Sequence, residues 1–175
     1  MVKPAIITAP RLVLIMGVAG SGKTTVGQLV ACALGCAFFE ADDFHSLANK
    51  TKMAHGLALD DADRAPWLVA LRAEMDECRA VGQRAVFTCS ALKDKYRAVL
   101  MRDTKDVVLV FLAVDIAVTI ARVDLRVGHF MKAEMVHGQF AELEPPADAL
   151  TIDATLSLDQ IVAQVVAHVA GAGRS

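Results

Sequence analysis

A glycine-rich stretch, GVAGSGKT at residues 17–24, constrains the fold of this chain more than any other feature of its sequence. It matches the pattern GxxxxGK[ST] in full. An apolar run, LVLIM at residues 12–16, precedes it, and a helix-forming segment starts near Lys23. A glycine-rich loop between a strand and a helix lets backbone N–H groups point inward, and the helix N-terminus adds a partial positive charge. The stretch therefore predicts a loop that holds a nucleoside triphosphate.

The side chains of this loop have separate expected roles. Lys23 is expected to reach the β- and γ-phosphates and to stay beside the γ-phosphoryl group as it transfers, while the Thr24 hydroxyl ligates Mg²⁺. Thr25 is kept with the loop, although packing or capping suits it better. The chain contains no NKxD and no DxxG sequence, so ATP is favoured over GTP. The predicted nucleotide-binding residues of the loop are Gly17, Val18, Ala19, Gly20, Ser21, Gly22, Lys23, Thr24 and Thr25.

Short β-branched runs alternate with longer segments of helical period along the rest of the chain. Continuous apolar strands are typical of a parallel sheet that helices cover on both faces. We therefore predict an α/β fold, a P-loop NTPase three-layer sandwich with a five-stranded parallel sheet, as one domain over residues 1–175. The expected strands are 12–16, 37–40, 84–89, 107–114 and 149–153, and the expected helices are 23–34, 64–81, 94–102, 115–127 and 157–170.

Composition and charge argue against several classes of function. The formal net charge is -2, so no global field attracts nucleic acid or an anionic membrane. The chain is 55% hydrophobic, but its longest apolar run, residues 107–114, is far shorter than the roughly 20 residues of a membrane span. The four cysteines form no CxxC pair. With no signal-like N-terminus, we expect a cytoplasmic enzyme that binds neither nucleic acid nor membrane.

Acidic residues follow the second expected strand. Ligands of open parallel sheets bind beyond the carboxyl ends of the strands, so Glu40, Asp42, Asp43 and His45 are expected to face the phosphate loop. Asp42 is the candidate base, because phosphoryl transfer to a hydroxyl needs a carboxylate that orients it and accepts its proton. Glu40 is expected to hold a water of the Mg²⁺ shell. The predicted metal set is Thr24, Glu40 and Asp42.

Three long motifs stand in the remaining sequence. ADDFHSLANKTKMAHGLALDDADRAPWL lies at residues 41–68, CSALKDKYR at 89–97 and RVGHFMKAEMVHGQFAELEPP at 126–146. In this order they are similar to the patterns GDDFHPxxNxxKMxxGxPLxDxDRxPWL, CSALKxxYR and RxxHFMxxxMxxxQFxxLExP. These patterns are typical of the gluconokinase family, which the chain therefore resembles: short P-loop kinases that phosphorylate D-gluconate and are related to shikimate kinase and nucleoside monophosphate kinases. The resemblance covers about residues 11–155.

This resemblance implies ATP and Mg²⁺ as cofactors, D-gluconate as the acceptor and a homodimer. A carboxylate with several hydroxyls needs cationic and polar partners, and the residues implied for this role are Asp42, His45, Arg64, Lys93, Arg97 and His129. Arg64 or Arg97 is preferred for the carboxylate because a guanidinium matches its geometry.

The resemblance also implies a mobile lid at approximately residues 126–140. Arg122 and Arg126 are separated by four residues and so share one helix face, from which they would contact the nucleotide and the transferring phosphate. Together with Lys23 and Asp42, Arg126 completes the predicted catalytic set.

Three positions depart from the pattern. Ala41, Ser46 and Ala58 replace a glycine and two prolines, which changes the backbone restraint around the acceptor site. The leading hypothesis is phosphorylation of D-gluconate to 6-phospho-D-gluconate. The alternatives are a kinase of another small hydroxy acid or nucleotide, as in shikimate kinase, and a non-catalytic module that switches partners on binding ATP.

Overall fold

The computed structural model describes residues 12–103, 106–124 and 133–172. Its strands are β1 (Leu12–Met16), β2 (Ala37–Glu40), β3 (Ala85–Cys89), β4 (Val107–Ala113) and β5 (Leu150–Asp153). Its helices are α1 (Lys23–Leu34), α2 (Leu47–Ala54), α3 (Asp61–Ala80), α4 (Asp94–Leu100), α5 (Ile116–Asp124), α6 (Ala133–Glu142) and α7 (Leu158–Ala172), with a 3₁₀ turn, η1, at Ala41–Phe44.

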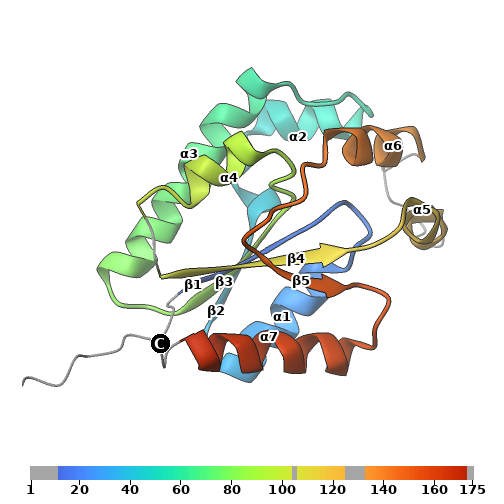
Figure 1. Ribbon diagram of the computed structural model, residues 1–175. Helices are drawn as coiled ribbons and strands as arrows, with labels where there is room; N and C mark the ends of the chain where they lie inside the picture. The colour runs from blue at the N-terminus through green and yellow to red at the C-terminus, as the bar shows by residue number, and fades with distance from the viewer. Residues whose placement is uncertain (1–11, 104–105, 125–132, 173–175) are drawn as a thin grey trace, which may run out of the picture.

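All strand pairs are parallel, and the sheet order is β2-β3-β1-β4-β5. Figure 1 shows three layers, with α3 and α4 on one face of the sheet and α1 and α7 on the other. Successive strand residues point to opposite faces. Accordingly Leu12, Leu14 and Met16 pack with α3 and α4, whereas Val13 and Ile15 pack with α1 and α7. The predicted fold class and all five strands are confirmed.

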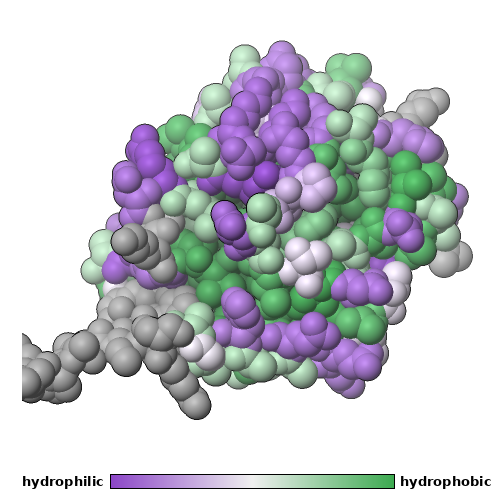
Figure 2. Space-filling view, in the orientation of Figure 1, coloured by the Kyte–Doolittle hydropathy of each residue, from purple (hydrophilic) through white to green (hydrophobic). Residues whose placement is uncertain are grey.

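The surface of the same view is divided by hydropathy. In Figure 2, hydrophilic side chains cover the helices above and below, while hydrophobic side chains gather across the middle, where β4 and β5 lie. β5 is one of the two edge strands, and among the described residues it pairs only with β4. None of the helices in the described ranges combines the length and the hydropathy that crossing a bilayer requires.

Two helices were not among the expected ones. α2 has little apolar period and buries only Asn49, but Ser46 caps it by accepting a hydrogen bond from the Asn49 backbone N–H at 3.1 Å. α6 lies in the segment predicted as a lid. In addition, α3 begins at Asp61 rather than at residue 64, because Asp60 and Asp63 form a capping box.

Candidate active site

The phosphate loop connects β1 to α1 with the expected backbone. Gly20 and Gly22 have φ angles of 78° and 93°, which residues with a Cβ rarely adopt. A Cβ on Gly20 would lie 3.1 Å from Val123 and 3.2 Å from Thr119, because α5 packs closely on the loop. Gly22 has no side chain to cap the first amides of α1. Those amides can therefore bind an anion.

Most residues predicted for the nucleotide line one cavity of about 690 Å³. Lys23 Nζ donates to the Val18 carbonyl at 2.8 Å, so the lysine crosses its own loop. The predicted loop residues that line the cavity are Ala19, Gly20, Gly22, Lys23, Thr24 and Thr25. Gly17, Val18 and Ser21 are buried behind the lining.

Glu40, at the end of β2, is held by two hydroxyl groups. The Thr24 hydroxyl donates to one carboxylate oxygen at 2.6 Å, and the Thr88 hydroxyl donates to the other at 2.7 Å. Thr88 is a buried polar residue at the end of β3, which sequence reasoning did not single out. Since Thr24 gives its proton to Glu40, its oxygen lone pairs point away from that bond. This arrangement suits a cation beside Thr24.

Asp42 lies in η1 with its side chain 78% exposed, and it lines the cavity with Glu40. The turn is held by Trp67 of α3, whose indole N–H donates to the Ala41 carbonyl at 2.7 Å in the core. Trp67 is buried and also forms part of the cavity lining. Asp43, which was expected to face the loop, is exposed and does not line the cavity.

His45 is buried and stacks on Trp67 with ring centroids 4.3 Å apart. Burial, with smaller effects of Lys50 and Arg64, lowers the pKa of His45 to about 4, so the ring is neutral at pH 7. The Asn49 side-chain amide lies 3.4 Å from Nδ1 and also donates to the Asp63 carbonyl. An Nδ1 that accepts from Asn49 leaves the proton on Nε2, 3.9 Å from Asp42. His45 was expected among the cationic and polar partners of the acceptor, and a neutral ring fits the polar part of that role.

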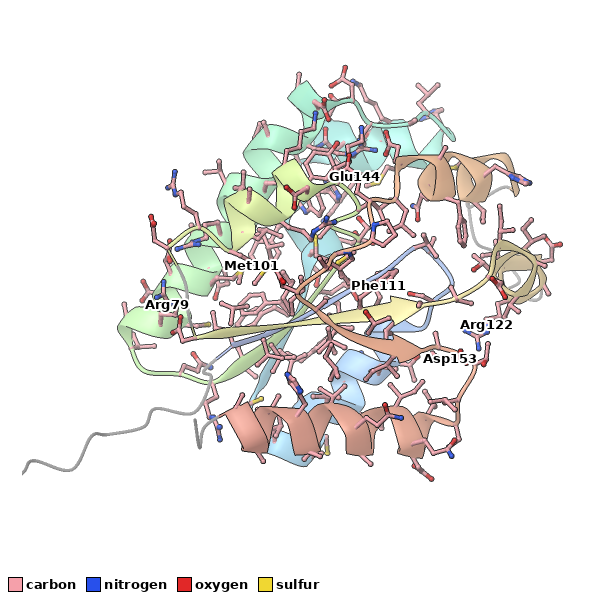
Figure 3. All side chains as sticks on the ribbon, viewed as in Figure 1. Arg79, Met101, Phe111, Arg122, Glu144 and Asp153 are labelled. Carbon is pink, nitrogen blue, oxygen red and sulfur yellow. The ribbon has the colours of Figure 1, made fainter. Side chains whose placement is uncertain are left out.

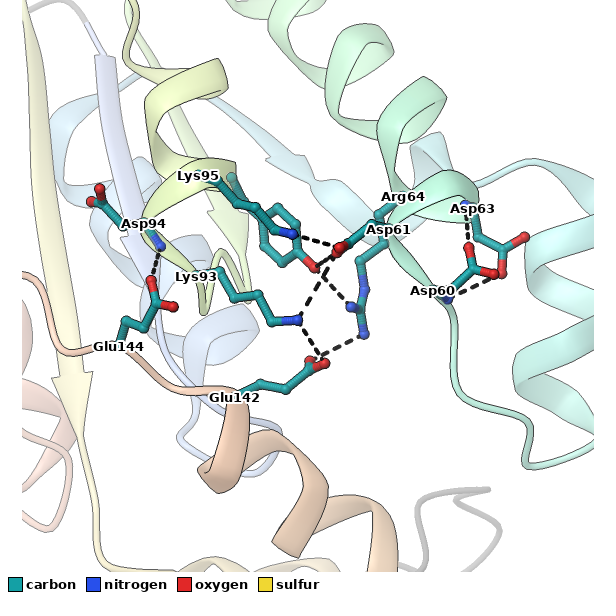
Figure 4. Close-up of polar contacts among 10 residues, drawn as sticks. Asp60, Asp61, Asp63, Arg64, Lys93, Asp94, Lys95, Glu142 and Glu144 are labelled. Atoms are coloured by element: carbon teal, nitrogen blue, oxygen red, sulfur yellow. Dashed lines mark hydrogen bonds and ion pairs between the residues drawn. The ribbon is translucent and has the colours of Figure 1, made fainter.

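Arg64 and Lys93 meet at the α3 and α4 side of the site (Figure 4). Arg64 lines the cavity, donates to the Tyr96 hydroxyl at 2.8 Å and pairs with Glu142 at 3.3 Å. Lys93 pairs with Glu142 at 2.9 Å, and this hydrogen bond raises the pKa of the lysine. Asp61 accepts from Lys95 and Tyr96, which lowers its pKa to about 2. The two cations thus lie side by side, although Lys93 itself is not part of the lining.

Arg97 is not at the cavity, which argues against its predicted contact with the substrate. Its side chain is buried, and its guanidinium donates to the carbonyls of Ala91 and Leu92 at 3.0 and 2.9 Å. Ala91 has a φ of 42°, an unfavourable angle for a residue with a Cβ. Arg97 therefore stabilises the turn that places Ser90 in the cavity lining and leads to Lys93.

Arg122 lies beside the phosphate loop, on the opposite side of the site. Its guanidinium donates to the Ala154 carbonyl at 2.7 Å and approaches the Gly20 carbonyl at 3.5 Å, so it joins α5 to the end of β5 near Asp153 (Figure 3). Arg126, His129 and the first part of the predicted lid lie outside the described residues. The later part of that lid is α6, which borders the cavity through Met135, Gly138, Gln139 and Glu142.

Gln139 and Glu142 were also not among the residues predicted from the sequence. Gln139 Oε1 accepts a hydrogen bond from the Ala19 backbone N–H at 2.6 Å, and Glu142 pairs with Arg64 and Lys93. Gln139 stands at a fixed position of the quoted family motif, so its polar side chain on an amphipathic segment was a usable signal. Glu142 falls where that motif specifies no residue, and nothing in the sequence marked it.

The fold and this site define a small-molecule kinase of the P-loop class. A phosphate loop, a carboxylate after β2 and the Arg64 guanidinium line one cavity at the carboxyl ends of β1, β2 and β3.

Comparisons with known proteins narrow the class. A model of the shikimate kinase family matches residues 19–142. A probable gluconokinase of Mus musculus is 39% identical to this chain, and the alignment covers 90% of this chain and 97% of the mouse protein. A gluconokinase of Gluconobacter oxydans is 38% identical, and the alignment covers 91% of each chain. The crystal structure of a gluconokinase from Sinorhizobium meliloti matches with a TM-score of 0.85 at 35% identity, covering 95% of each chain. The chain belongs to the gluconokinase family.

Proposed function

We propose that this protein transfers the γ-phosphoryl group of ATP to D-gluconate and forms 6-phospho-D-gluconate. The observation that carries the proposal is the single cavity lined by Lys23, Asp42 and Arg64, in a chain whose relatives are gluconokinases. The loop would hold the triphosphate at one end, and the cationic pair Arg64 and Lys93 would hold the acceptor's carboxylate at the other. Arg122, Arg126 and His129 remain proposed contacts of the lid region.

The positions of Lys23, Asp42 and His45 in the cavity lining support the following reaction. Asp42 accepts the proton of the terminal hydroxyl as that oxygen bonds to the γ-phosphorus, and the bond from this phosphorus to the bridging β,γ-oxygen breaks. Lys23 neutralises the negative charge that develops on the bridging β,γ-oxygen as this bond breaks. His45, neutral and with its Nε2 proton toward Asp42, is suited to orient the carboxylate or a hydroxyl of the sugar acid.

Mg²⁺ fits the residues present. Thr24 and Glu40 provide oxygen atoms beside the loop, with Asp42 on the same cavity wall. The described residues contain no cluster of three or more histidine, cysteine or acidic side chains that could hold a metal. Few protein ligands suit Mg²⁺, which commonly keeps several waters and binds one or two carboxylates together with substrate phosphates. When bound, it would neutralise charge on the β- and γ-phosphates.

The test is a coupled ADP-release assay over a panel of sugar acids and shikimate, with the wild type, Asp42→Asn and Asp43→Asn. We expect turnover with D-gluconate, a loss of several orders of magnitude in kcat for Asp42→Asn with nucleotide affinity retained, and near wild-type kcat for the exposed Asp43→Asn. Stimulation by shikimate but not by gluconate would identify the alternative acceptor. ATP binding without turnover on any acceptor would identify a switch module.

A further inference from the structure

Helix α6 presents two oxygen-bearing side chains to the cavity, Gln139 and Glu142. They are three residues apart and therefore lie on the same face of the helix. Each contacts a donor group that the proposed function assigns to a substrate. One helix thus touches both ends of the site.

The first contact is at the phosphate loop. The backbone N–H of Ala19 donates to Gln139 Oε1 at 2.6 Å, across 120 residues of sequence. This N–H belongs to the loop whose amides hold phosphate oxygens in proteins of this class. The neutral amide oxygen of Gln139 therefore occupies one N–H donor of this loop, which an anionic oxygen could bind only after Gln139 has moved away.

The second contact is at the cationic pair. Glu142 lies 2.9 Å from Lys93 Nζ and 3.3 Å from an Arg64 guanidinium nitrogen (Figure 4). The other guanidinium nitrogen is bonded to Tyr96, and Asp61 is farther from Lys93, at 3.9 Å. The Glu142 carboxylate therefore holds the groups that the carboxylate of a sugar acid would need.

We propose that Gln139 and Glu142 are internal competitors of the two substrates, and that Glu142 limits how tightly the site binds a sugar acid. This inference rests on the proposed function. Because both contacts come from α6, a ligand that displaces one of them weakens the attachment of the helix and lowers the cost of displacing the other. Nucleotide and sugar acid should therefore bind synergistically, and by linkage each should tighten the other by the same factor.

Isothermal titration calorimetry tests this with D-gluconate and a non-hydrolysable ATP analogue, each alone and each in the presence of the other. Glu142→Gln keeps the shape of the side chain and removes its charge. Glu142 is 34% exposed, and ion pairs of this kind contribute modestly, so we expect about 3- to 10-fold tighter gluconate binding without nucleotide. We also expect a smaller effect of the ATP analogue on gluconate affinity.

Two further variants complete the design. Gln139→Ala should increase the affinity for the ATP analogue by a few-fold and also reduce the synergy between the two ligands. Glu77→Gln, an exposed change of the same charge near the C-terminal end of α3, should leave both affinities and the synergy at wild-type values.

The outcomes separate this inference from the proposed function. The inference alone would be overturned if the wild type binds and phosphorylates gluconate but Glu142→Gln binds gluconate no more tightly. If Glu142→Gln binds gluconate more weakly than the wild type, Glu142 is instead a residue that orients Arg64 and Lys93. If the wild type binds each ligand with the same affinity whether or not the other is present, the proposed coupling between the two ligands is wrong. A wild type that binds no gluconate would overturn the proposed function and this inference together.

Discussion

Arg97 gives the sharpest test of how the acceptor side of the site is built. Its guanidinium was expected to contact the substrate, whereas in the structure it donates to the Ala91 and Leu92 carbonyls. Arg97→Met keeps much of the side-chain volume and removes both donors. A structural role predicts lower stability, and a substrate contact predicts weaker binding of gluconate.

The magnitude follows from the burial of the group. Only 5% of Arg97 is exposed, so the two carbonyls would lose their partners in a place that water barely reaches. Hydrogen bonds from a charged donor contribute about 1.5–3 kcal/mol each, and relief of the buried charge's desolvation offsets part of the loss. We therefore expect the free energy of unfolding to fall by about 2–4 kcal/mol, within the range of other buried polar deletions.

Urea unfolding followed by the fluorescence of Trp67, the chain's single tryptophan, measures this loss directly. Arg102→Met is the matched control: the Arg102 side chain is 78% exposed, and its removal should change stability by no more than about 0.5 kcal/mol. The apparent KM for gluconate of folded Arg97→Met should stay within a few-fold of wild type. Unchanged stability with a KM at least tenfold higher would refute the structural role.

Two further predictions concern the segment after β2. Ser46→Ala removes the cap of α2 and should lower the free energy of unfolding by about 1 kcal/mol, whereas Ser46→Asp should retain most of it; equal losses in urea titrations would argue against capping. His45 is neutral in the folded protein and titrates near 6.5 when unfolded, so the unfolded chain binds more protons between these pKa values. Wild-type stability should therefore fall as pH drops from about 6.5 to 4, by at most about 1.4 kcal/mol per pH unit from this group. The His45→Gln variant should lack this contribution to the pH dependence of stability. If thermal unfolding gave the same pH profile for both proteins, the titration of His45 would not be its source.

Much of the fold could be predicted because its signals are local. The five strands are continuous buried runs, and the loop at residues 17–24 combines positive φ angles with a helix start, which few sequences other than a glycine-rich one support. α2 was missed because its stability comes from one cap and from tertiary contacts of Asn49 rather than from an apolar period.

Lys23, Thr24 and Asp42 line the cavity, as expected for residues whose position is fixed by their neighbours in sequence; their roles in the reaction stay predictions. The site was not predictable where long-range pairing decides the role. Arg97 and Arg64 are equally basic in sequence, but one faces two backbone carbonyls and the other faces the cavity. Burial is the main cause of the lowered pKa of His45, and only the fold buries this ring against Trp67.

The position of β3 between β1 and β2 determines how far apart donor and acceptor can be. Adjacent strands are about 4.8 Å apart, so the ends of β1 and β2 are separated by about 10 Å. That span accommodates a phosphorus atom with an attacking and a leaving oxygen in line. The reach of the transfer is thus set by the spacing of hydrogen-bonded strands in the central layer of the molecule. Exchanging the segments that follow β2 and β3 could change which alcohol is selected while leaving this reach intact.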